Sequence, residues 1–246
     1  MKPNSTVIGV LIGLLFFSCG AGETIMTKPE KQPINFSAKV SKKPTSKFWD
    51  FKDLSGWKDA TQSGGINYHI ENEQLKIYTR ANTWDRSKVK TTSTYSTGIY
   101  TWRIFVPEMG VGDMATIGAF LYNSNNHELD FEIGYGKQVY RTELDAAMDD
   151  LIVHMTSQDN PSKSFKAKIK RGQWHTFSIE LSLNSSRHYN VNWKINNELA
   201  ATAQLDYGLK KKFAIFCSVE NLTFIGDHIP KKQNYALFDS VEYTTN

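Results

Sequence analysis

The strongest constraint on this chain is a nine-residue stretch, His127-Glu128-Leu129-Asp130-Phe131-Glu132-Ile133-Gly134-Tyr135, in which acidic and apolar residues alternate. Successive side chains of a β-strand point to opposite faces, so Glu128, Asp130 and Glu132 share one face and Leu129 and Phe131 share the other. The apolar face can be buried in a core. The acids repel one another, and no fold needs them for stability. The stretch therefore predicts a core strand whose acidic face has a function.

Strand-like segments surround this stretch from residue 48 onward. Besides 128–135, strands are predicted at 66–70, 75–78, 87–94, 98–106, 115–122, 138–144, 151–157, 164–170, 174–182, 189–195, 198–204, 212–219 and 236–244. Residues 71–74 predict a hairpin turn, and the polar segment 87–94 predicts an exposed strand. The segment 143–151 is the one alternative helix. Gly, Asn, Asp and Ser between the segments are typical of an all-β sandwich or barrel.

The first 47 residues predict export rather than part of the folded body. Residues 1–18 hold a short apolar run after Lys2, which is typical of a signal peptide. The Ser18-Cys19-Gly20 sequence that follows resembles the lipobox of bacterial lipoproteins, in which Cys19 becomes lipidated. Ordinary cleavage near Cys19 is the alternative. Residues 19–47 are rich in Lys and Pro and predict a flexible tether, which leaves 48–246 as the one folded domain.

The net charge of +4 belongs to the leader and the tether. Residues 20–47 carry six lysines and two glutamates, so the segment 48–246 is close to neutral. We therefore expect no basic groove on the folded body and no nucleic acid as a partner. Cys217 lies in an apolar segment and is predicted to be a buried thiol, because a lipidated Cys19 leaves it without a disulfide partner.

The spacing of the acids suits glycosidic bond cleavage. At about 3.3 Å per residue, the Cα atoms of Glu128 and Glu132 lie about 13 Å apart, and their side chains can lean toward each other. Their carboxyl groups can then approach the separation of about 5 Å that is typical of retaining glycosidases. Asp130 lies between them and can hold a hydrogen bond to one of them. A solvated acidic face and a cation site remain open as alternatives.

The same stretch resembles the Glu-(Ile/Leu/Val)-Asp-x-Glu signature of family 16 glycoside hydrolases, in the form without an inserted residue. Lichenases and xyloglucan endotransglycosylases carry this form. The resemblance extends over about 48–245. It includes Gly98-Ile99-Tyr100-Thr101-Trp102-Arg103-Ile104, Gly118-Ala119-Phe120-Leu121-Tyr122, Trp174-His175-Thr176-Phe177, Val191-Asn192-Trp193-Lys194-Ile195-Asn196-Asn197 and Phe238-Asp239-Ser240-Val241-Glu242-Tyr243.

The resemblance implies a jelly-roll β-sandwich of two curved antiparallel sheets with a concave substrate cleft. It also implies that Glu128 is the nucleophile, Asp130 the assisting acid and Glu132 the acid/base. Arg103 is expected in the cleft, in contact with substrate or with the nucleophile. Tyr122 belongs to the segment before the acids and is a further expected substrate contact.

Some positions depart from the family pattern. Thr101 stands where the family often has Glu. Asn126, an expected substrate contact, stands where lichenases carry Trp two residues before the nucleophile. Leu121 occupies the expected place of the aromatic residue in the family's Ala-Phe-Trp segment. These departures predict a cleft with few aromatic side chains.

Few residues outside these segments are candidates for a sugar-binding or metal site. Most of the six tryptophans are expected in the core, whereas Trp84 lies in a polar loop and is the best candidate for an exposed sugar platform. The six histidines lack metal-ligand spacing and are expected at the surface or in hydrogen bonds, so no metal site or cofactor is predicted. A structural calcium ion at Asp145, Asp149 and Asp150 is a minor alternative.

Together these features favour a retaining, endo-acting glycoside hydrolase that cleaves a β-linked, β-glucan-like polysaccharide. It is expected to be a monomer, lipid-anchored to a membrane of the bacterial cell envelope. Two alternatives remain. The chain is a non-catalytic glycan-binding lipoprotein on the same scaffold, or a transglycosylase that shares the chemistry and differs in its acceptor.

Overall fold

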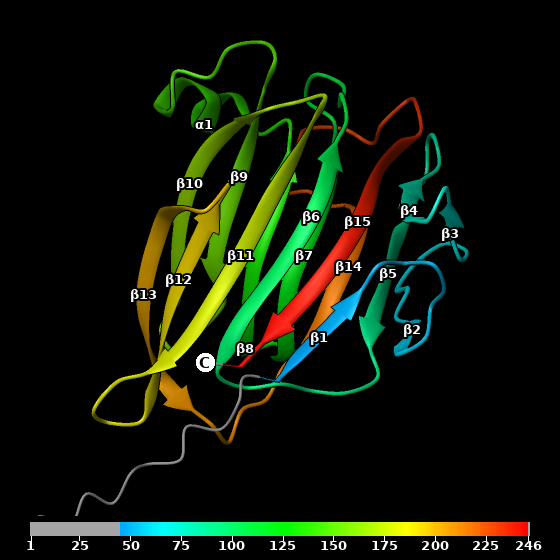
Figure 1. The fold of residues 1–246 in the computed structure, drawn as a ribbon. Coiled ribbons are helices and arrows are strands. Elements are labelled where there is room, and N and C mark those ends of the chain that lie inside the picture. The colour runs from blue at the N-terminus through cyan, green and yellow to red at the C-terminus, as the bar shows by residue number, and fades with distance from the viewer. Residues whose placement is uncertain (1–44, 246) are drawn as a thin grey trace, which may run out of the picture. The chain divides into compact units, whose positions relative to one another are not determined.

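The computed structural model describes residues 45–245, which form two antiparallel β-sheets packed face to face (Figure 1). The predicted signal peptide, Cys19 and most of the tether lie outside the described residues. The larger sheet, sheet A, has the order β13 (Glu198–Gly208), β12 (His188–Ile195), β11 (Gln173–Leu183), β6 (Gly98–Val106), β15 (Asn234–Thr244), β4 (Gln74–Thr79), β3 (Tyr68–Glu71), with β1 (Ser46–Trp49) also paired to β15. Sheet B has the order β10 (Lys163–Lys170), β9 (Asp150–Ser157), β8 (His127–Gly134), β7 (Ala115–Ser124), β14 (Ala214–Asn221), β5 (Arg86–Thr91), β2 (Trp57–Asp59). The predicted jelly-roll sandwich is confirmed.

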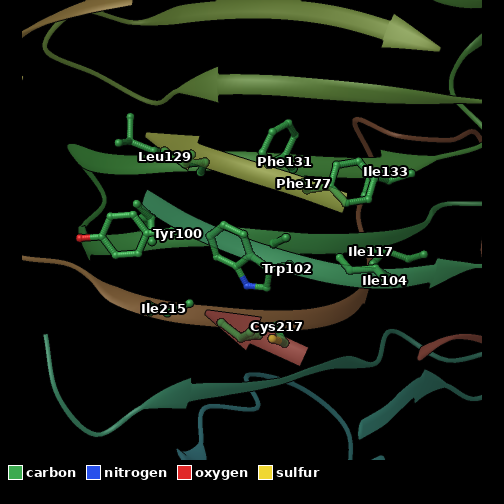
Figure 2. Packing of buried hydrophobic residues seen from close by; sticks show 14 of the residues in the cluster. Tyr100, Trp102, Ile104, Ile117, Leu129, Phe131, Ile133, Phe177, Ile215 and Cys217 are labelled. Carbon is green, nitrogen blue, oxygen red and sulfur yellow. The ribbon is translucent and has the colours of Figure 1, made fainter. Parts of the chain in front are cut away.

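The core lies between the sheets because each strand alternates apolar and polar side chains. In Figure 2, Trp102 and Phe177 of sheet A lie beside Phe131 and Ile133 of sheet B, and all four are fully buried. Phe131 and Phe177 meet with ring centroids 5.2 Å apart. The Trp102 indole also donates a hydrogen bond across the sandwich to the carbonyl oxygen of Phe216, at 3.0 Å. The two sheets are thus joined by a polar bond as well as by apolar packing.

Most predicted strands are present within a few residues of their predicted ends. The predicted hairpin at 71–74 is confirmed, with Asn72 and Glu73 as its two turn residues at φ values of 51° and 58°. Such positive values match the right-handed twist of the flanking strands. Cys217 is buried as a free thiol, as predicted. The short strands β1 and β2 were not predicted, because neither is long enough to show an alternation of apolar and polar residues.

The predicted strand at 138–144 is wrong. Its residues form the helix α1 (Gln138–Glu143), and the alternative helix at 143–151 is a turn followed by β9. Arg141 explains the difference, because its buried guanidinium donates to the carbonyl oxygens of Tyr135, Ala147 and Asp150 at 2.5–2.9 Å. The helix places this side chain within hydrogen-bond distance of all three. The segment is held by tertiary hydrogen bonds, which local periodicity does not reveal.

The prediction of an exposed strand at 87–94 is also wrong in its burial. In β5, Ser87, Lys88, Val89 and Thr91 are all buried. Ser87 and Thr91 share the inward face of the strand with Val89, whereas Lys88 lies on the outer face and is covered by Glu220 and the Phe120 ring. Among residues 45–245, no helix is long and apolar enough to cross a membrane.

Candidate active site

Strand β8 presents the three acids on the outer face of sheet B. Leu129 and Phe131 are fully buried in the core, as predicted (Figure 2). The pleat therefore turns Glu128, Asp130 and Glu132 away from the core. Asp130 and Glu132 are nevertheless only 1% and 8% exposed, so other side chains cover them.

The neighbouring strands supply this cover and shape a cleft. On β7, Gly118, Phe120 and Tyr122 lie directly opposite Glu132, Asp130 and Glu128 in register. A cavity of about 630 Å³ lies over this face. Its side chains come from β5, β14, β7 and β8, from Asp59 on β2, and from the loops beside these strands. They include Arg86, Lys88, Lys90, Phe120, Tyr122, Asn125, Glu128, Glu132, Gln158, Phe216, Glu220 and Phe224.

Hydroxyl and amide donors hold two of the acids in place. Asp130 Oδ2 accepts hydrogen bonds from Thr156 Oγ1 at 2.5 Å and from Gln158 Nε2 at 2.9 Å. Glu132 Oε2 accepts one from Thr116 Oγ1 at 2.8 Å. The other oxygen of Asp130, Oδ1, is buried and has no hydrogen-bond partner among the described residues. Donors to a carboxylate favour its charged form, so Asp130 is the best supported of the three as an anion.

Burial and mutual repulsion raise the pKa values of all three acids. Burial, then the charge of Asp130, raises the pKa of Glu128 to about 8. Burial raises the pKa of Asp130 to about 6, against the donors that favour its anion. Burial, then the charge of Glu220, raises the pKa of Glu132 well above its usual range. The acids interact with one another and titrate as a group.

A fourth acid, Glu220 on β14, was missed by the sequence analysis. It is 1% exposed, and its Oε2 atom lies 2.7 Å from Lys88 Nζ and 2.6 Å from Arg86 Nε. Lys88 is itself 5% exposed and also donates to Gln62 Oε1 at 3.0 Å. The sequence feature that could have identified it is an acidic residue at an outward-facing position of a mostly apolar strand. A buried charged group of this kind is costly unless its partners hold it well.

The expected substrate contacts on the β7–β8 side divide into two groups. Tyr122 lines the cleft, where its hydroxyl donates to Asn125 Oδ1 at 2.7 Å. Asn126 does not line the cleft, because its amide turns to Asp159 Oδ2 at 2.8 Å. Asn125, one residue earlier, takes its place.

Arg103 is not a cleft residue, which corrects the prediction. It lies on β6 in sheet A, while the acids lie on sheet B. Trp102 and Ile104 on either side of it are fully buried, so Arg103 points outward from the opposite side of the sandwich. Its Nε atom pairs with Asp239 at 3.3 Å, and its guanidinium lies over the Trp174 ring at 5.3 Å.

The expectation of few cleft aromatics is also wrong. Leu121 is fully buried in the core, and the preceding Phe120 faces the cleft. Phe120 stacks on Phe216 with ring centroids 4.6 Å apart and an interplanar angle of 17°. Tyr122 meets Phe216 edge to face at 5.8 Å. Trp84 is 52% exposed but is not among the residues that line the cleft.

His154, which lies beside the acids on the neighbouring strand β9, is buried, whereas the histidines were expected at the surface or in hydrogen bonds. His154 on β9 lies opposite Glu132 in register, is 5% exposed, and packs against the rings of Tyr140 and Phe224. Burial, then the charge of Lys166, lowers its pKa to about 4, so its ring is neutral at pH 7. Within residues 45–245, no cluster of His, Cys, Asp and Glu could hold a metal ion.

The minor calcium alternative is not supported by the acidic loop. The Nζ atom of Lys170 lies 2.8 Å from carboxylate oxygens of both Asp149 and Asp150. Lys168 Nζ donates to the carbonyl oxygen of Asp145 at 2.5 Å. Lysine ammonium groups thus occupy the positions from which these oxygens would bind a cation.

The fold is that of known β-glucanases and a transglycosylase. A Bacillus licheniformis β-glucanase matches with a TM-score of 0.58 and 15% identity, over 82% of this chain and 98% of that chain. The catalytic domain of an endo-1,3-β-glucanase (laminarinase) from Thermotoga petrophila matches with a TM-score of 0.59 and 14% identity, over 81% of this chain and 96% of that chain. Crh5 transglycosylase matches with a TM-score of 0.61 and 12% identity, over 81% of this chain and 84% of that chain.

Sequence comparisons find less than the structural ones. No profile of a known protein family matches the chain, and no curated protein matches it. The resemblance to family 16 glycoside hydrolases is therefore confirmed at the level of the fold, on structures with low sequence identity.

Proposed function

We propose that this protein is a retaining, endo-acting glycoside hydrolase that cleaves a β-linked polysaccharide. The observation that carries the proposal is the group of acids on the outer face of β8, at the floor of an aromatic-lined cleft. The raised pKa values of Glu128 and Glu132 keep protons on both carboxyl groups near neutral pH, while Asp130, with a pKa of about 6, carries a negative charge. Glu132 is therefore available as the proton donor, and Glu128 reacts in the fraction of molecules in which it has lost its proton.

Glu128 acts as the nucleophile and Glu132 as the acid/base. In the first step a Glu128 oxygen bonds to the anomeric carbon while the glycosidic bond breaks, and Glu132 gives its proton to the leaving oxygen. In the second step Glu132 takes a proton from water, whose oxygen displaces Glu128 and restores the free acid. Two inversions at one carbon retain its configuration.

Asp130 influences the pKa values of these two acids. Its side chain is held by Thr156 and Gln158, and its charge raises the pKa values of both Glu128 and Glu132. A negative charge beside Glu132 keeps the acid/base protonated until the leaving group needs the proton. The same charge opposes a second negative charge on Glu128, so Glu128 reacts from a destabilised anion.

The width of the cleft favours a polymer as the substrate. Strands β5, β14, β7 and β8 are neighbours in sheet B, and three strand spacings of about 4.8 Å give a floor of about 14 Å. This is longer than one sugar ring. The stacked Phe120 and Phe216 offer apolar surface beside the acids, as sugar faces require.

A substrate panel tests the proposal. The purified domain is incubated with a range of β-glucans and β-galactans, and new reducing ends are measured. We expect release from at least one polymer, abolished by Glu128→Gln and unaffected by Glu198→Gln, a matched change at an exposed glutamate on sheet A. Absence of release from every polymer, or activity in Glu128→Gln, would contradict the assignment.

Azide rescue tests the two roles separately. In Glu128→Ala, azide replaces the missing nucleophile and gives a glycosyl azide of inverted configuration. In Glu132→Ala, azide attacks the glycosyl-enzyme and gives an azide of retained configuration, when the substrate has a good leaving group. The reverse pattern would exchange the two roles.

A transglycosylase shares these steps and differs only in the acceptor. The match to Crh5 transglycosylase makes this the second candidate. Product analysis with an added oligosaccharide separates the two, because a transglycosylase gives longer products in place of reducing ends. Binding without either product would support the non-catalytic alternative.

We further propose that the protein is exported and anchored to the bacterial cell envelope through Cys19. The proposal rests on the apolar leader and the lipobox-like Ser18-Cys19-Gly20. Labelled palmitate should be incorporated into the expressed chain and lost in Cys19→Ser, while Cys217→Ser, the matched change at the buried thiol, keeps the label. Label retained in Cys19→Ser would rule the anchor out.

A further inference from the structure

The cleft is divided by charge. Glu128 and Glu132 lie on β8, whereas β5 carries Arg86, Lys88 and Lys90 on the same outer face. Two further acids line the cleft, Glu220 on β14 and Asp59 on β2. Val89 between the lysines is fully buried, so alternation turns both lysines toward the cleft. The near-neutral net charge of the domain had predicted no basic groove. A net charge does not report how charges are distributed, and here the cations gather on one side of the cleft.

Only part of this positive charge is neutralised by the protein. Arg86 and Lys88 share the buried Glu220. Lys90 has no ion pair within residues 45–245, and its Nζ atom lies 5.6 Å from the centre of the Phe216 ring. Lys58 on β2 is directly opposite Lys90 in register and is also without an acidic partner in this part of the chain. Like charges in directly opposite positions destabilise a sheet. Asp59, next to Lys58 on β2, is the acid that lines this end of the cleft, and it forms no ion pair with either lysine among the described residues.

A buried donor lies between the two halves of the cleft floor. Ser218 on β14 is opposite both Lys88 and Gly118, and Gly118 is opposite Glu132. The Ser218 hydroxyl is fully buried, has no hydrogen-bond partner among the described residues, and lies 2.3 Å from where a Cβ on Gly118 would be. The absence of a side chain at Gly118 makes room for this hydroxyl beneath the floor, and Ser218 itself does not line the cleft.

We propose that the β5–β2 side of the cleft binds an acidic substituent, a sulfate ester or a carboxylate, on the polysaccharide chain. The substrate is then an anionic β-linked polysaccharide rather than a neutral β-glucan. Lys90 lines the cleft and the exposed Lys58 lies opposite it, so these two residues supply the charge, and Phe216 lies under the sugar ring that carries the substituent. This inference rests on the proposed function, since it names the substrate class of the same cleft.

The distance between the two halves allows an anion to bind beside an acidic catalytic centre. Strand β5 lies three strands from β8, or about 14 Å. The Debye length is about 8 Å at physiological ionic strength, so the β8 acids repel an anion at this distance only weakly. The β5–β2 cations lie next to it. A substituent on the sugar at β5 is therefore attracted, while an acidic group on the sugar at β8 is repelled.

Binding to a silenced enzyme tests the inference independently of turnover. In the Glu128→Gln background, calorimetry compares a sulfated β-galactan with its desulfated form, and a β-linked uronate polymer with its carboxyl-reduced form. We expect at least one anionic polymer to bind 10-fold or more tightly than its neutral partner. The sulfate and carboxylate arms distinguish the two sources of charge. Equal affinity within both pairs would overturn the inference.

Charge variants locate the effect. Lys90→Gln should weaken binding of the preferred anionic polymer about 5-fold to 10-fold, Lys90→Arg should restore most of it, and Lys47→Gln on β1 of sheet A is the matched control. Unchanged binding in Lys90→Gln and Lys58→Gln would overturn the inference, as would a polynucleotide that binds as tightly as the preferred polymer. Preferential binding without cleavage by the wild type would instead contradict the hydrolase. Cleavage of neutral polymers alone would leave the hydrolase standing.

Discussion

Replacing Glu128 with Gln should stabilise the fold at high pH while it abolishes turnover. The pKa of Glu128 is about 8, against an ordinary value of 4.5. The folded state therefore holds this proton more tightly than the unfolded state does. Below pH 4.5 both states are protonated, and the variant and the wild type differ little. Above it the unfolded chain releases the proton first, so wild-type stability falls until the pH passes the folded pKa.

The size of the effect follows from the shift. At 1.36 kcal/mol per unit, a rise from 4.5 to about 8 corresponds to a ceiling of about 5 kcal/mol. Water reaches the partly exposed Glu128 and screens its charge, so we expect about 2 kcal/mol at pH 8.5. For a domain of this size that equals a rise in Tm of roughly 4–8 °C.

Chemical denaturation of both proteins at pH 4.5 and pH 8.5 measures this difference. Comparison of variant and wild type at each pH removes the contributions of all other titrating groups. Glu198→Gln, at an exposed position, should show no difference that depends on pH. If Glu128→Gln gains no stability between pH 4.5 and pH 8.5 relative to the wild type, the argument that burial and Asp130 hold its proton is wrong.

Three further predictions concern the cleft. Because the pKa of Glu128 is raised, the acid limb of the profile of kcat/KM against pH should lie well above pH 4.5, and a limb at pH 4–5 would contradict this. Phe120→Leu keeps an apolar side chain but loses the ring stacked on Phe216, so kcat/KM should fall roughly 5-fold to 100-fold, and because Phe120 is buried the smaller side chain should also lower Tm. Arg103→Ala removes a side chain on the opposite sheet and should leave kcat/KM within about 2-fold of wild type, and a larger loss would restore Arg103 to the site.

The sequence identifies the acid strand because its evidence is local. Alternation places Leu129 and Phe131 in the core and the acids outside it, and the pairing of β8 with β7 and β9 keeps this division. The sandwich fold follows from many such segments and from the family resemblance. Nothing beyond the segment itself is needed to see which of its residues share a face.

The errors have two physical causes. Alternation shows that Thr101 and Arg103 share a face, but which sheet carries that face depends on strand order between distant segments. For Phe120 and Leu121, a one-residue offset against the family pattern moved the aromatic side chain from one face to the other. The aromatic floor of the cleft was missed for the same reason, because it depends on the register of β7 against β14.

Long-range polar contacts account for what was missed. Glu220 is a site residue because Lys88 and Arg86, more than 130 positions earlier, reach it across paired strands. The segment around Arg141 forms a helix because carbonyl oxygens from both sides of it in the sequence accept hydrogen bonds from its guanidinium. Neither convergence leaves a periodic signal in the sequence.

The hydrogen bond from Trp102 to the Phe216 carbonyl bears on how the cleft treats a polymer. It fixes the strand under the aromatic floor to the opposite sheet, so a sliding motion of one layer over the other would break a buried polar bond. A floor held in this way changes its shape little when a chain binds to it. On the proposed function, the polymer rather than the cleft then has to adjust, and pliable or amorphous polymers should be consumed before crystalline ones.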